Sequence, residues 1–224
     1  MLGQLGFEQP QPNEKLRNRI SLFIIPNAEG NKIVKKYHYL HRARTGGQQL
    51  TYGILFDGKL VGVLVYTSPT FRKKKGLIPP LINGEVIELA RVWLSDEAPK
   101  HSETCSLGKS LRRIRDDWLR KYGQFIKAVI SFSDLEFGHK GVIYKAANFN
   151  DCGFVPSARL ADARNRYSRA NKGRGSRHYT KQSQHHSAPR TANTNRVWLY
   201  FFGQDIREVK VADVLLRHRE ATGC

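Results

Sequence analysis

An acid, Asp134, and a phenol, Tyr144, share the segment VISFSDLEFGHKGVIYKAANF, residues 129–149. Asp134 ends an apolar run that predicts a buried strand, and Tyr144 falls in a helix predicted over about 139–149. Open α/β sheets bind their ligands beyond the carboxyl ends of the strands. Asp134 could therefore act as a general base and Tyr144 as a proton donor. A turn aspartate and a core tyrosine are the alternative interpretations.

Arg91 is an unexpected charge inside the apolar segment EVIELARVWLS. Strand alternation places Arg91 on the same face as Leu89 and Trp93, with Glu88 on the opposite face. A guanidinium in apolar surroundings is costly unless it is paired, so we expect Asp134 on the neighbouring strand to be its partner. Arg91 could hold a donor carbonyl or phosphate at a catalytic site, or it could only neutralise a carboxylate.

The segment YHYLHR supplies two histidines and two tyrosines on a helix predicted over residues 31–41. His38 and His41 are three positions apart, so they could share one helical surface and, with a carboxylate, bind iron or zinc. A polar helix face would give the same spacing. Tyr37 and Tyr39 could stack on a nucleic-acid base, although one of them could instead pack in the core.

The charge balance points to a polyanionic partner. The chain has 38 Lys+Arg and 19 Asp+Glu, a formal net charge of +19 and a pI near 10.1. Such self-repulsion favours nucleic acid as the partner, and the absence of a basic amphipathic helix with a bulky apolar face makes an anionic membrane the weaker choice. No apolar run is long enough for a membrane span and no signal-peptide core is present, so we expect a soluble cytoplasmic protein. Three cysteines without CxxC spacing fit a reducing compartment.

Two basic segments are the expected contacts to phosphate. The low-complexity stretch 157–196 predicts an insertion that could not form a core of its own, and it interleaves basic residues with tyrosines. The loop FRKKKG, residues 71–76, could hold the backbone from another side. A solvated loop is the alternative for both. The candidate contacts are Lys73, Lys74, Arg164, Arg166, Arg174 and Arg177.

The remaining patterns predict one α/β domain over residues 1–224 with a mixed sheet. Strands are expected at 20–25, 50–56, 60–66, 85–95, 125–132 and 196–203, and helices at 31–41, 104–122, 139–149 and 211–220. Asp57-Gly58-Lys59 predicts a hairpin turn. The helix 104–122 joins two strands that should therefore be parallel. This order resembles the GNAT-like acyltransferase fold, in which two central parallel strands splay apart; here these would be 85–95 and 125–132.

Three segments carry a closer resemblance: YHYLHR, IELARVWLSDEAPKHSE and SFSDLEFGHKGVIYKAANF. Together they resemble the Mom family of phage DNA-modification proteins. The resemblance implies a GNAT-like fold and an enzyme that adds a small amide-bearing group to the exocyclic N6 of adenine in phage DNA, which protects that DNA from host restriction enzymes. It also implies that Ser133 and Asp134 lie at the substrate. DNA is then the partner, with adenine flipped out of the duplex or already single-stranded.

The resemblance leaves the group donor open. GNAT-like enzymes cradle the pyrophosphate of coenzyme A with a glycine-rich basic loop, whereas HSETCSLGKS at this position offers one glycine and one lysine. Acetyl coenzyme A is therefore not favoured as the donor. Two other functions fit the same sequence: an N-acyltransferase acting on a protein, RNA or small-molecule amine, and a noncatalytic nucleic-acid-binding protein.

Overall fold

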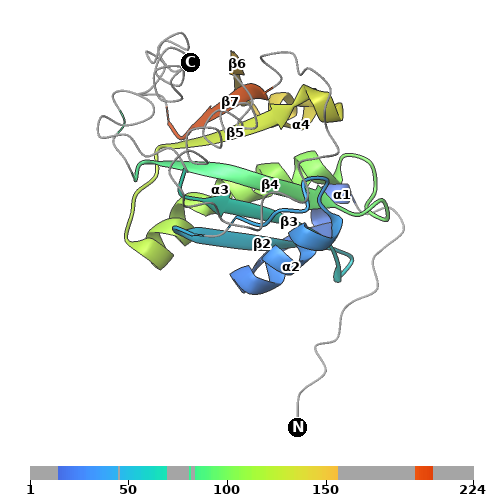
Figure 1. Ribbon diagram of the computed structural model, residues 1–224. Helices are drawn as coiled ribbons and strands as arrows, with labels where there is room; N and C mark the ends of the chain where they lie inside the picture. Colours follow the sequence, from blue (N-terminus) through green and yellow to red (C-terminus); the bar gives the residue numbers. More distant parts are fainter. Residues whose placement is uncertain (1–14, 45, 70–80, 82–83, 156–194, 204–224) are drawn as a thin grey trace, which may run out of the picture.

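The computed structural model describes residues 15–44, 46–69, 81, 84–155 and 195–203, which build one seven-stranded mixed sheet (Figure 1). The strand order is β1-β2-β3-β4-β5-β7-β6. Only β4 and β5 are parallel, and every other neighbouring pair is antiparallel. The strands are β1 (Ile20–Ile25), β2 (Gln49–Phe56), β3 (Lys59–Thr67), β4 (Val86–Leu94), β5 (Ala128–Asp134), β6 (Asn150–Val155) and β7 (Asn195–Phe201).

Two main helices cover opposite faces of this sheet. Helix α3 (Ser102–Tyr122) packs Leu107, Ile114 and Trp118 into the largest apolar cluster, while α2 (Asn27–Tyr37) packs Val34 into a smaller cluster on the other face. Apolar residues at helical spacing explain the long α3. The short elements are α1 (Leu16–Arg19), the 3-10 helix η1 (Leu135–Phe137) and α4 (Val142–Ala146).

The β2–β3 hairpin turns where the sequence predicts it. Asp57 and Gly58 both have positive φ, 49° and 79°, as a two-residue turn that follows the twist of the strands requires. Arg19 forms an ion pair with Asp57. The parallel crossover through α3 is also confirmed, and it places β4 beside β5.

The parallel strands β4 and β5 separate after four paired residues. The ladder runs from Val86↔Ala128 to Leu89↔Ser131, and beyond it β4 stays paired with β3 while β5 stays paired with β7. The splay expected for a GNAT-like mixed sheet is therefore present in the topology of the chain.

A bulge in β4 lies beside this separation. Val65 is opposite Arg91 while Tyr66 is opposite Leu89, so Ala90 is the extra residue. A bulge reverses the alternation of side chains that follow it. Leu89 accordingly packs in the α3 cluster, whereas Trp93 packs with the α2 cluster. The predicted common face of Leu89, Arg91 and Trp93 is therefore wrong, and Arg91 shares the face of Glu88.

Three further differences from the predicted elements matter for the site. Helix α2 begins at Asn27 and ends at Tyr37, four residues earlier than expected at each end. Helix α4 is restricted to Val142–Ala146, and β6, which was not predicted, follows it. The segments 71–76 and 211–220, and the basic stretch 157–196 except for Asn195 and Arg196, lie outside the described residues.

No helix within the described ranges is long and apolar enough to cross a membrane.

Candidate functional site

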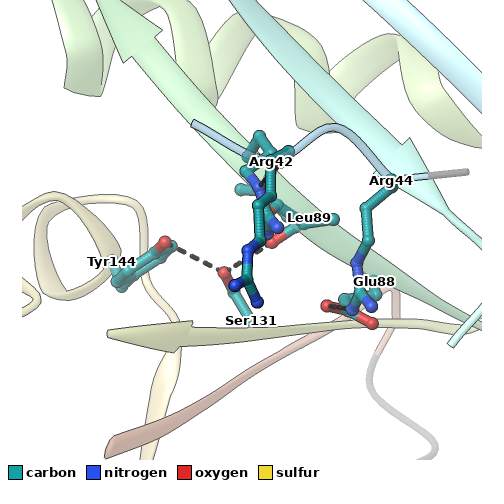
Figure 2. A network of polar contacts seen from close by, with 8 residues as sticks. Arg42, Arg44, Glu88, Leu89, Ser131 and Tyr144 are labelled. Carbon is teal, nitrogen blue, oxygen red and sulfur yellow. Dashed lines mark hydrogen bonds and ion pairs between the residues drawn. The ribbon is translucent and has the colours of Figure 1, made fainter. Parts of the chain in front are cut away.

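The buried phenol of Tyr144 is anchored where β4 and β5 separate. Ser131 Oγ lies 2.9 Å from the Tyr144 hydroxyl and 2.9 Å from the Leu89 carbonyl oxygen (Figure 2). A serine hydroxyl has one proton, and the carbonyl can only accept. Both the Leu89 carbonyl and the Tyr144 hydroxyl accept from Ser131, so this one proton is shared between them. The last residue pair of the parallel ladder thus orients the phenol.

Tyr144 keeps its proton in this environment. Burial raises the pKa of Tyr144 to about 12, because desolvation penalises the phenolate; the hydrogen bond with Ser131 opposes that shift. The ring stacks on Trp198 with centroids 5.6 Å apart. Gly141 precedes α4 with φ 76°, and a Cβ atom there would lie 2.1 Å from the Trp198 ring. Only glycine allows this approach, so Gly141 fixes the start of the helix that carries Tyr144.

A charged group lies on the other face of the separated strands. Glu88 is 3% exposed and forms an ion pair with Arg44 from the segment after α2 (Figure 2). Arg91 donates from Nε to the Arg42 carbonyl at 3.0 Å, and from Nη1 to the Ala90 carbonyl. Burial lowers the pKa of Arg91 and Arg44 adds to this, while Glu88 opposes it. The carboxylate that acts on Arg91 is therefore Glu88, and the expected pairing of Arg91 with Asp134 is replaced.

Asp134 is the last residue of β5 and is half-buried. Ser131 and Ser133 face the α3 side, where they bond Tyr144 and Trp198, so alternation directs Asp134 to the opposite face. Asp134 and the Tyr144 phenol thus stand on opposite sides of the point where the strands part. Ser133 is 3% exposed and its hydroxyl accepts the Trp198 indole N–H at 2.8 Å. Ser133 therefore has a core partner rather than an open face toward substrate.

The two histidines do not share a helix. Helix α2 ends at Tyr37, His38 has an extended backbone and His41 has φ 45°. The His38 ring is 5% exposed and accepts the Leu40 N–H, while His41 Nδ1 lies 3.1 Å from the Lys35 carbonyl. The helical reason for pairing His38 with His41 is therefore wrong. In the part of the chain that the structure places, no three His, Cys, Asp or Glu side chains gather closely enough to hold a metal ion.

His38 is held neutral by its surroundings. Burial, followed by the charges of Arg91, His139 and His41, lowers the pKa of His38 to about 3. A neutral ring is what its role as acceptor for the Leu40 N–H requires.

The predicted base-stacking tyrosines both lie at the surface. Tyr37 is 48% exposed and stacks on Trp93, with centroids 4.8 Å apart. Tyr39 is 37% exposed, stacks on His38 at 4.4 Å and contacts Phe137 at 4.7 Å. Tyr39 therefore contacts both the buried His38 ring and the exposed Phe137 ring. The candidate phosphate contacts Lys73, Lys74, Arg164, Arg166, Arg174 and Arg177 lie outside the described residues.

Sequence reasoning missed Ser131, Arg42 and Arg44. Figure 2 shows both arginines extending from one segment toward the separated strands, Arg44 onto Glu88 and Arg42 in the direction of Ser131. Two signals could have found the arginines. A glutamate inside an apolar strand needs a cationic partner, and two arginines follow the aromatic segment as Arg42-Ala-Arg44.

Comparison with known proteins gives three findings. A model described as the Mom protein family matches residues 19–215. A protein named methylcarbamoylase mom, from Escherichia phage Mu, is 30% identical over 124 residues, which is 54% of this chain and 48% of that protein. The chain thus spans about half the length of this curated relative. Among solved structures, a spermidine N-acetyltransferase from Vibrio cholerae has a TM-score of 0.45 at 5% identity, covering 86% of this chain and 99% of that chain. An IAA acetyltransferase from Bacillus cereus has a TM-score of 0.42 at 11% identity, covering 82% and 99%.

Proposed function

The chain belongs to the Mom protein family, and on that premise we propose that it is a phage DNA-modifying transferase that adds a small amide-bearing group to the exocyclic N6 of adenine. The phage Mu relative is named a methylcarbamoylase, and such a group fits that name. Modified adenine would protect the viral DNA from host restriction enzymes.

The observation that carries the proposal is the position of Tyr144. The segment that resembles the family most, residues 131–149, brings a protonated phenol to the separated ends of the parallel strands, where Ser131 orients it. A buried proton donor at such a place is expected of a catalytic site more than of a binding surface.

The chemistry requires help at both reacting atoms. The lone pair of the adenine amino group is delocalised into the purine ring, so N6 is a poor nucleophile. As the new bond from N6 to the donor carbon forms, the bond from that carbon to its leaving group breaks. Asp134 accepts the proton that N6 loses, and Tyr144 gives a proton to the leaving group. A carboxylate and a phenol on opposite sides of the separated strands suit these two transfers.

Arg91 has a third role, which is to stabilise negative charge on the donor. It lies among Arg44, Glu88 and the Arg42 carbonyl, so its guanidinium is held in one place before any ligand arrives. A fixed cation stabilises an oxygen of the donor as negative charge develops on it. The donor itself is a small molecule that carries the transferred group, and residues 101–110 do not favour acetyl coenzyme A.

The net positive charge of the chain and the exposed Tyr39 support DNA as the substrate. The net charge of +19 favours a phosphate backbone, and N6 of a paired adenine must leave the stack before an enzyme can react with it. Tyr39, at the exposed edge of the site, is suited to stack on that base.

The test is the mass of the deoxyadenosine in plasmid DNA. The protein is produced in a bacterium, its plasmid is digested to nucleosides, and these are compared with nucleosides from Asp134→Ala cells. We expect a heavier deoxyadenosine with the native chain, and at least about a hundredfold less of it with Asp134→Ala, because the amine loses its base.

Asp116→Ala is the matched control, since it removes one exposed carboxylate from α3 with the same change in charge. It should leave modification unchanged. A soluble native protein that alters no nucleoside would contradict the proposed function, and full activity of Asp134→Ala would remove Asp134 from the site.

A further inference from the structure

Exposed apolar side chains gather beside the candidate site. Among the described residues, eleven large apolar side chains are exposed, and five of them fall in residues 37–39 and 135–142. In the second segment, Leu135 is 37% exposed, Phe137 40% and Val142 68%. Single exposed apolar residues are ordinary, but a group at one place indicates a surface that meets a partner.

The two segments form one surface. The ring of Phe137 lies 4.7 Å from that of Tyr39, and the ring of His139 lies 4.5 Å from it. Tyr39 in turn stacks on the buried His38. The exposed Phe137 is therefore connected through Tyr39 to the buried His38 at the edge of the site.

The turn that carries Phe137 has a defined backbone. Residues 135–137 form the 3-10 helix η1, which is closed by hydrogen bonds from the Gly138 N–H to the Leu135 carbonyl (2.9 Å) and from the His139 N–H to the Asp134 carbonyl (3.3 Å). Asp134 immediately precedes the turn. A stiff aromatic side chain on such a turn loses little entropy when it is inserted into a partner.

The charge of the chain fits DNA. Lys140 and Lys145 are exposed in the same segment and balance the acids Asp134 and Glu136, so the attraction to DNA comes from the whole chain, which carries +19. Apolar side chains flanked by basic residues are the means by which proteins insert between base steps of a duplex.

From this placement we propose that Leu135 and Phe137 form a wedge that enters duplex DNA and fills the space left by the flipped adenine. The inference rests on the proposed function and adds to it the residues that open the duplex. Phe137 replaces the stacking that the neighbouring bases lose, while the adjacent Tyr39 receives the extruded base. The wedge is needed only where a base must leave a paired stack, because an unpaired base costs much less to extrude.

The test compares paired and unpaired DNA. Plasmid DNA, either native or heat-denatured, is incubated with purified protein and a clarified extract of the bacterial host that supplies the donor. The heavier deoxyadenosine is then measured. Phe137→Ala should lower its yield in native plasmid at least about tenfold, the scale of one lost base-stacking contact, and leave the yield in denatured plasmid unchanged.

Phe23→Ala is the matched control, because Phe23 is 39% exposed on β1, three strands away from β4. It should behave as the native chain on both substrates. Equal loss on both substrates with Phe137→Ala would overturn the wedge, since Phe137 would then act in the chemistry or the folding. No loss on either would overturn it as well.

A binding measurement separates this inference from the proposed function. If the native chain modifies neither substrate, its affinity is measured for a duplex with a tetrahydrofuran abasic site and for the same duplex fully paired. If Phe137 is a wedge, the native chain should bind the abasic duplex about tenfold more tightly than the paired duplex, and Phe137→Ala should lose that preference. Equal affinity of the native chain for both duplexes would overturn the wedge.

Discussion

Two carboxylates, Asp117 on α3 and Glu88 on β4, are buried to a similar degree but are satisfied differently. Asp117 is 5% exposed and accepts hydrogen bonds from the Tyr52 hydroxyl at 2.6 Å and from Arg120 at 3.0 Å, with Arg113 at 3.3 Å. Glu88 is 3% exposed; its Oε1 pairs with Arg44, and its Oε2 is buried without a hydrogen-bond partner within the placed ranges.

The difference distinguishes a structural carboxylate on the α3 face from a candidate functional carboxylate on the opposite face of the sheet. A buried polar group is ordinarily fully hydrogen-bonded, and an exception needs an explanation. The partners of Asp117 are side chains of β2 and of α3 itself, so this network ties the helix to the sheet and stabilises the fold. The Glu88 group lies where β4 and β5 part, and its spare acceptor is available to a ligand or to Arg91.

The first prediction tests the difference between the two carboxylates with two isosteric substitutions. Glu88→Gln should lower DNA modification at least about tenfold, because the carboxylate that sets the charge around Arg91 is lost. Asp117→Asn should leave modification by the folded protein unchanged and lower the free energy of unfolding by about 1–2 kcal/mol, as charge-assisted hydrogen bonds weaken. Urea titration and the nucleoside assay measure the two effects. An equal loss of activity in both variants would show that the two networks do not differ in role.

The second prediction concerns acid stability at the edge of the site. The folded protein keeps His38 neutral, with its pKa lowered to about 3 from the ordinary 6.5, so the unfolded chain binds more protons between these values. The stabilising contribution is complete above about pH 6.5 and is lost as the pH falls toward 3. Between these limits, the free energy of unfolding of the native chain should fall with decreasing pH by about 1 kcal/mol per unit more than that of His38→Asn.

His101→Asn is the control for this measurement, since His101 is exposed and is not among the groups that act on His38. Its pH slope should match that of the native chain. Parallel slopes for the native chain and His38→Asn would mean that His38 is not held neutral by burial.

Local patterns predicted much of the fold, and long-range contacts account for the rest. Asp57-Gly58 fixed the hairpin, and the apolar spacing from Leu107 to Trp118 predicted the crossover helix. The strand Asn150–Val155 was missed because NDCGFV has no clear alternation; it is held by β7, which lies beyond residues 156–194.

The sequence predicted that the candidate residues lie near the separated strands but not which groups they contact, and their catalytic roles stay a prediction. Tyr144, Asp134 and Arg91 are brought to the separated strands as expected, but the partners differ. The bulge at Ala90 depends on how β3 pairs with β4, and it moves Arg91 to the face of Glu88. No pattern within EVIELARVWLS reveals an extra residue, so alternation alone assigned Arg91 to the wrong face.

The most direct test of the account removes one hydroxyl from the Tyr144–Ser131 pair at the separated strands and one from the Asp117 network. Tyr144 and Tyr52 are both buried, and burial raises the pKa of each phenol, so both stay protonated. In the nucleoside assay, Tyr144→Phe should reduce the heavier deoxyadenosine at least about a hundredfold, because the leaving group loses its proton donor. Tyr52→Phe should keep that activity and lose about 1–2 kcal/mol of unfolding free energy, because Asp117 loses a hydrogen bond. A folded Tyr144→Phe protein that modifies DNA as well as the native chain would contradict the assignment of chemistry to the separated strands.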